Sequence, residues 1–189
     1  MRTIYVIISK TGTVPARLIG TFSKASYSHS SLSLNSDFSE MYSFARRKIN
    51  NPFYAGFIKE DFKTGIFNKY NYCNCIIYAL DVTDESYNKL TEMLKPYIAD
   101  PLAYKYSILG LFTCWFNIKW ERKKHFVCSG FISKILNESG CLTSKKDPRI
   151  YRPIDFMNEP QLKQIYQGAI KDIPVPIDTS IADNQENSN

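Results

Sequence analysis

The stretch CSGFISKILNES, residues 128–139, decides the fold class of this chain. Its apolar residues recur at helical spacing and share one face, and Gly140 follows as a natural C-terminal stop. We therefore expect one amphipathic helix that packs on a core and begins at a cysteine. The apolar face holds Cys128, Phe131, Ile132, Ile135 and Leu136.

The segments that precede this helix are mainly typical of strands. Residues 2–9 form a short β-branched apolar run, and residues 27–34 alternate between polar and apolar side chains. A turn at 35–37 leads to a returning strand at 40–45, and residues 74–82 are rich in Ile, Tyr and Leu. We expect an α+β domain in which an antiparallel sheet packs against the helix at 128–139.

Three further amphipathic pieces complete the expected elements. A short helix is expected over about 13–23, and Thr83 opens a longer one whose apolar stripe ends at Asp100. Another amphipathic piece covers 161–170.

Two segments are harder to assign. Residues 46–70 contain an Asn-Asn-Pro run and Gly56, which predicts a long loop with short strand pieces. Residues 106–120 are strongly apolar and aromatic but too short to span a bilayer. They form either a buried helix or an exposed apolar ledge.

The length of the chain limits the number of domains, and its cysteines indicate the redox compartment. A chain of 189 residues suffices for one domain, which we place at 1–172. Residues 173–189 are rich in proline and then acidic and polar, and we expect them to form a disordered tail. The five cysteines are scattered and no secretory signal leads the chain, so we expect free thiols in a reducing cytoplasm.

The net charge and the small number of metal-binding and phosphate-binding residues limit the classes of partner that we expect. The net charge of +6 would attract polyanions, but no nucleic-acid motif accompanies it, and a solvated basic surface is the simpler interpretation. With two histidines in the chain, a four-ligand zinc site is hard to assemble. No phosphate-binding glycine loop is present, and we expect no metal and no cofactor.

Cys128 is the strongest candidate for chemistry. A helix N-terminus presents unpaired N–H groups and a partial positive charge, both of which favour a thiolate. The same N–H groups can hold a developing oxyanion. The alternative is that Cys128 is a small buried apolar residue on the face of the helix that meets the core.

His29 is the candidate base for this thiol. Its position in the strand matches Ser31 and Ser33, so it faces away from Leu32 and the apolar side. The alternative is that His29 has a purely structural role and that a neighbouring residue forms hydrogen bonds with its imidazole. The other histidine, His125, lies three residues before Cys128, where we expect it to line the site at most.

A third group should orient the imidazole. If 27–34 and 38–45 form a hairpin, paired positions sum to about 72. Ser43 then lies opposite His29, while Glu40 lies about three positions further along. The register is uncertain by one or two residues, so Ser43 and Glu40 both remain candidates.

The run FVCSGFI, residues 126–132, resembles the nucleophile helix of the NlpC-type cysteine peptidases. In those enzymes the histidine follows the cysteine, whereas here both histidines precede Cys128. The run YSHSSL, residues 27–32, resembles the histidine strand of the circularly permuted branch, the YiiX-like and lecithin–retinol-acyltransferase-like proteins. This resemblance implies a permuted papain-like fold with Cys128 as nucleophile and His29 as base.

The chain also departs from these families. Val127 stands where the unpermuted peptidases usually have Asp, and Ser43 stands near where YiiX-like proteins tend to carry a carboxylate. The resemblance thus leaves the orienting residue open.

Three functions remain in view. The first is a cysteine hydrolase of the peptidase or amidase class, acting on a peptide, an isopeptide or a cell-wall fragment. The second is a lipid acyltransferase or thioesterase that contacts a membrane peripherally through 106–124, provided that this segment is exposed. The third is a catalytically weak binding module on the same fold.

Overall fold

The computed structural model describes residues 1–10, 27–48, 51–62 and 73–177. The helix predicted over 13–23 lies outside these residues.

One eight-stranded sheet runs through the described part of the chain, in the order β7-β6-β4-β3-β2-β1-β5-β8. Neighbouring strands are antiparallel except for β6 and β7, which are parallel. The α+β prediction is therefore confirmed, and the predicted antiparallel sheet needs a correction at this one pair. The strands are β1 Arg2–Lys10, β2 His29–Ser33, β3 Met41–Lys48, β4 Asn51–Glu60, β5 Asn74–Val82, β6 Lys105–Tyr106, β7 His125–Phe126 and β8 Lys163–Ala169.

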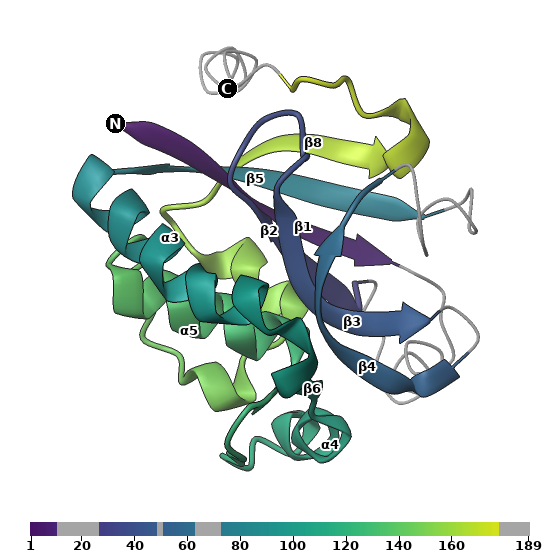
Figure 1. Ribbon diagram of the computed structural model, residues 1–189. Coiled ribbons are helices and arrows are strands. Elements are labelled where there is room, and N and C mark those ends of the chain that lie inside the picture. The colour runs from purple at the N-terminus through teal and green to yellow at the C-terminus, as the bar shows by residue number, and fades with distance from the viewer. Residues whose placement is uncertain (11–26, 49–50, 63–72, 178–189) are drawn as a thin grey trace.

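The helices gather on one side of this sheet. Figure 1 shows α3 and α5 side by side on one face, with α4 below them near β6. Within the described residues the α-helices are α3 Asp84–Ala99, α4 Ile108–Trp115 and α5 Cys128–Ser139. The short 3₁₀ turns are η1 Pro101–Ala103, η2 Pro148–Ile150, η3 Pro153–Asn158 and η4 Ile170–Asp172.

Both long helices begin and end where the sequence predicts. The hydroxyl of Thr83 accepts a hydrogen bond from the N–H of Ser86 and caps α3. Gly140 ends α5 in the left-handed conformation, with φ of 80°. The apolar face predicted for α5 is buried in full.

Two layers of side chains fill the two faces of the sheet. The face under α3 and α5 carries the larger core, in which Phe131 of α5 packs its ring against Phe44 and Phe57 of the sheet. The opposite face carries a smaller core that includes Tyr5, Ile7, Met41 and Ile77 together with Cys73, Cys75 and Ile177. Because side chains alternate along a strand, Ser31 belongs to the second face and Leu32 to the first. His29 is the first residue of β2, and from the end of the strand it reaches both Glu60 and the start of α5.

The loop predicted over residues 46–70 is wrong in its central part, because β4 occupies Asn51–Glu60 and pairs with β3. Gly56 suggested a break in the chain. It lies instead within the strand, where a Cβ atom would collide with the backbone oxygen of Tyr104. Gly56 thus marks a close approach of β4 to the segment before β6.

The beginning of the predicted tail packs on the sheet. Ile177 is buried in the smaller core, and its N–H donates to the carbonyl of Ser36. Residues 178–189 lie outside the described part of the chain.

No helix in the described residues combines the length and the apolar character needed to cross a membrane.

Candidate active site

A buried ion pair joins β2 to β4. The Nε2 atom of His29, the first residue of β2, lies 2.9 Å from Oε1 of Glu60, the last residue of β4. Both side chains are buried, with relative exposures of 8% for each residue. A carboxylate in such a place is stable only with a charged or hydrogen-bonding partner, and the imidazolium supplies both.

Serines support the carboxylate of Glu60. The hydroxyl of Ser31 donates to Oε2 and also lies 3.3 Å from Nε2 of His29. The buried hydroxyl of Ser43 is close enough to Glu60 to help lower its pKa, although it makes no hydrogen bond of normal geometry. Both serines share the strand face of His29, so the sheet itself builds this polar pocket.

Cys128 sits at the first position of α5, and the turn that follows it is anchored to the loop after the helix. The hydroxyl of Ser129 donates to the carbonyl of Tyr151. At Gly130 an added Cβ would come within 2.7 Å of the carbonyl oxygen of Pro148, so a glycine is needed for this close packing. The N-cap residue, Val127, makes no side-chain capping bond, which leaves the N–H groups of the first turn to other partners.

The thiol of Cys128 and the imidazole of His29 are coupled. Burial alone would lower the pKa of His29, but the charge of Glu60 and the hydrogen bond to Cys128 outweigh it and raise the pKa to about 10. Burial would likewise raise the pKa of Cys128, but the hydrogen bond and charge of His29 lower it. Ser30 lies close enough to lower it further, although its hydroxyl makes no hydrogen bond of normal geometry. Each of the two groups therefore shifts the pKa of the other towards its charged form, thiolate for Cys128 and imidazolium for His29.

The pKa of Glu60 completes the pattern. Burial opposes its charge, yet the charge and hydrogen bond of His29 and the hydroxyl of Ser31 hold the pKa of this carboxyl below its usual range. The three ionisable side chains therefore form one line of alternating charge: thiolate, imidazolium, carboxylate.

The other four cysteines behave in the opposite way. All five thiols are free and buried. Burial raises the pKa of Cys73 and Cys141, and raises that of Cys75 to about 12 and that of Cys114 to about 11. Cys128 alone among the five has a lowered pKa, so its position is what distinguishes it.

Tyr106 of β6 adds a phenol to the site. Burial and the neighbouring sulfur of Cys128 raise the pKa of Tyr106 well above its usual value, so the hydroxyl keeps its proton. Its hydroxyl lies close enough to the sulfur of Cys128 for the sulfur to raise this pKa together with burial. Sequence reasoning assigned no role to this residue.

The structure brings together the predicted nucleophile and base and corrects the predicted orienting residues. The observed β2–β3 register pairs Leu32 with Tyr42, so positions sum to 74 and not to about 72. By the same register Ser43 falls opposite Ser31, and it lies close enough to Glu60 to help lower the pKa of that carboxyl. Glu40 is exposed in the turn before β3, where its N–H binds Asn35.

Glu60, which does orient His29, escaped the sequence analysis because its strand was taken for a loop. No local signal in Phe57-Ile58-Lys59-Glu60 marks a buried carboxylate. The pairing of β3 with β4, in which Met41 lies opposite Glu60, carries this residue to the face of His29.

The remaining candidates play lesser parts. His125 is half-buried, and its Nδ1 lies 2.9 Å from the carbonyl of Lys123, outside the charge line. Across the described residues, no three His, Cys, Asp or Glu side chains gather as metal ligands would.

No family model, curated protein or solved structure matches this chain.

Proposed function

We propose that this protein is a cysteine hydrolase of the peptidase or amidase class, with Cys128 as nucleophile, His29 as general base and Glu60 as the residue that orients the imidazole. The observation that carries this proposal is the single buried line Cys128–His29–Glu60, in which the thiol has a lowered pKa. Structural cysteines are inert because burial raises their pKa, whereas catalytic ones sit beside a cation at a helix N-terminus.

The chemistry proceeds by acyl transfer through a thioester. The thiolate of Cys128 attacks the carbonyl carbon of an amide or ester and forms a tetrahedral intermediate. His29 gives its proton to the departing amine or alcohol as the carbon–heteroatom bond breaks. Water then attacks the thioester while His29 takes its proton, and the acid product and the thiolate are released.

Glu60 acts on this cycle through His29. Its bond to Nε2 fixes the ring plane and leaves Nδ1 for the proton exchange with sulfur. Its charge stabilises the imidazolium that must persist while the thiolate is free.

Two donors are placed to stabilise the oxyanion. One is the backbone N–H of Cys128 at the uncapped start of α5. The other is the hydroxyl of Tyr106, which keeps its proton and lies beside the sulfur.

The order of these groups along the chain also supports a permuted papain-like arrangement. The histidine strand comes first, the carboxylate strand second and the nucleophile helix last, and α5 packs on β2 and β3. Two short motifs and this order are the support for that fold assignment.

The hydrolase proposal is tested with p-nitrophenyl acetate. We expect a burst of about one equivalent of p-nitrophenolate, followed by continued turnover, because the thioester at Cys128 forms and is then hydrolysed. Mass spectrometry should place the acetyl group on Cys128 during the burst. Both signals should vanish in Cys128→Ala and persist in Cys114→Ala, a matched control for a buried thiol with a raised pKa. Acetylation elsewhere, or turnover equal to that of Cys128→Ala, would contradict the proposal.

Tyr106→Phe separates oxyanion stabilisation from thiol ionisation. Loss of one oxyanion donor slows acylation by about 100-fold. The pH midpoint of thiol alkylation should move much less, because His29 still holds the thiolate. Tyr104→Phe is the control, since the ring of Tyr104 packs against that of Tyr97 with centroids 4.2 Å apart. Equal acylation rates in the two variants would exclude Tyr106 as a donor.

A further inference from the structure

The segment that contains α4 is an apolar surface and not part of the core. Six of its large side chains are between 39% and 71% exposed, whereas Leu111 and Trp115 are half-buried. So many exposed aromatic and aliphatic neighbours are unusual. We name this surface the apolar ledge. It consists of Ile108, Leu109, Phe112, Phe116, Ile118 and Trp120.

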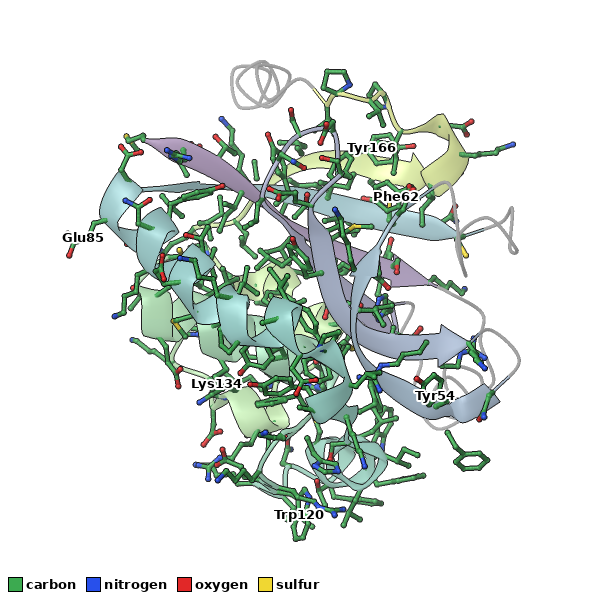
Figure 2. All side chains as sticks on the ribbon, in the orientation of Figure 1. Tyr54, Phe62, Glu85, Trp120, Lys134 and Tyr166 are labelled. Carbon is green, nitrogen blue, oxygen red and sulfur yellow. The ribbon has the colours of Figure 1, made fainter. Side chains whose placement is uncertain are left out.

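The ledge continues onto the end of β4. Phe53 is 83% exposed and lines, together with Tyr106, Leu109 and Trp120, a surface hollow of about 260 Å³. Figure 2 shows Trp120 at the lower end of the molecule and Tyr54 on the side of β4. Side chains from three separated segments thus form one apolar face.

Basic side chains surround this face. Between residues 104 and 124 the chain carries five cations and one anion, Glu121, which gives five minus one or a net charge of +4. Asp147 lies nearby, but its charge is already balanced by Lys119 and Arg149. The cations are all exposed: Lys105, Lys119, Arg122, Lys123 and Lys124.

We propose that the apolar ledge docks this protein on the surface of an anionic phospholipid bilayer. A membrane interface accepts aliphatic and aromatic side chains in its outer hydrocarbon layer, while lysines and arginines at the rim bind acidic headgroups. Aromatic side chains such as Trp120 favour this boundary. The ledge lies flat on the bilayer, since no helix in the described residues can cross one.

The charge of the rim argues for lipid over a second copy of the chain. A twofold contact through the ledge would place the same basic rim on both sides, and like charges across an interface oppose association. A bilayer with acidic headgroups offers the complementary charge and an apolar interior at the same time.

Docking would set the active site at the membrane plane. Tyr106 lines the hollow beside the ledge and also contacts Cys128, and Gly110 of α4 lies against Val127, the residue before the nucleophile. Membrane docking does not depend on catalysis, and it can be measured on Cys128→Ala.

The test is co-sedimentation of the Cys128→Ala chain with vesicles. One set contains phosphatidylglycerol and phosphatidylcholine, and the other contains phosphatidylcholine alone. We expect binding to the first set. Lys105→Gln/Lys123→Gln should weaken it about 25-fold, at about fivefold for each cation. Phe112→Ser/Phe116→Ser should weaken it about 100-fold, because each buried ring contributes about tenfold.

Matched control variants test whether binding depends on the ledge itself and not on the total charge or total apolar surface of the protein. Lys89→Gln/Lys171→Gln removes two exposed cations outside the rim, and Met157→Ser removes an exposed apolar side chain outside the ledge. Both should bind like the parent, and thermal unfolding should show that every variant is folded.

Three results would overturn the proposal: no sedimentation with either vesicle set, equal loss in the control variants, or a dimer in sedimentation velocity that Phe112→Ser/Phe116→Ser dissociates. Failure of the hydrolase proposal would instead appear as absent p-nitrophenyl acetate turnover with vesicle binding intact.

Discussion

Iodoacetamide is expected to alkylate Cys128 with a pH midpoint well below the free-cysteine value of about 8.5 in the wild-type chain, and near or above it in His29→Ala. The imidazolium is the group that lowers the thiol pKa against the effect of burial. Without it, burial and the nearby Glu60 carboxylate both disfavour the thiolate. The midpoint is read from the alkylation rate of Cys128, followed by mass spectrometry between pH 5 and 10.

The alkylation rate at a fixed pH changes less than the shift in pH midpoint alone would suggest. At pH 6 a thiol with a pKa of about 8.5 is ionised by about 0.3%, so a thiol that is almost fully ionised at this pH has about 300-fold more thiolate. A thiolate of lower pKa is also a weaker nucleophile, which offsets about tenfold of this gain. We therefore expect about a 30-fold loss of rate at pH 6 in His29→Ala.

Glu60→Gln tests whether Glu60, and not Glu40, orients His29. The neutral amide keeps a hydrogen bond to Nε2 but removes the charge that raises the His29 pKa, so the midpoint should fall between those of the wild type and His29→Ala. Glu40→Gln is the matched control, because Glu40 is exposed in the turn before β3. If Glu40→Gln shifted the midpoint as much as Glu60→Gln, the assignment of Glu60 would be wrong.

His29→Ala is expected to lower the free energy of unfolding by about 3–5 kcal/mol, because removal of one partner leaves a buried carboxylate uncompensated. Glu60 is only 8% exposed and its oxygens lose the bond to Nε2. Urea unfolding at pH 6 measures the effect. The double variant His29→Ala/Glu60→Gln should be more stable than His29→Ala, since it no longer buries a lone charge.

The pH dependence of this pair has a definite sign. The pKa of His29 is raised from 6.5 to about 10, so its contribution to stability is complete below pH 6.5 and is lost as the pH rises towards 10. The pKa of Glu60 is lowered from 4.5, so its contribution is complete above pH 4.5 and is lost as the pH falls through the lowered value. The stability difference between Cys128→Ala and Cys128→Ala/His29→Ala should therefore be largest between pH 4.5 and 6.5. The shared Cys128→Ala background removes the thiolate, whose titration runs in the opposite direction.

An exposed pair supplies the control for these stability measurements. Lys134 and Glu138 are bonded across one turn of α5 at the surface, where solvent screens the charges. Glu138→Gln should cost less than about 1 kcal/mol. A loss of that small size in His29→Ala would mean that the His29–Glu60 pair is hydrated and does not form a buried unit.

The sequence alone determined the features that depend on local periodicity and capping. The α5 helix, its cysteine at the first position and its glycine stop follow from residues 128–140, because helix formation and capping depend on neighbours along the chain. The strand that begins at His29 follows from the alternation of polar and apolar residues along the chain.

Only the tertiary structure decided which group orients His29 and what the apolar segment does. Glu60 lies 31 positions from His29 and reaches it because β3 pairs with both β2 and β4, and pairing register is a property of the whole sheet. Gly56, which suggested a loop, is instead the place where another backbone approaches the strand. The composition of residues 108–120 fits a buried helix and an exposed apolar surface equally well. The segment is exposed because α3 and α5 already cover the face of the sheet that carries the larger core.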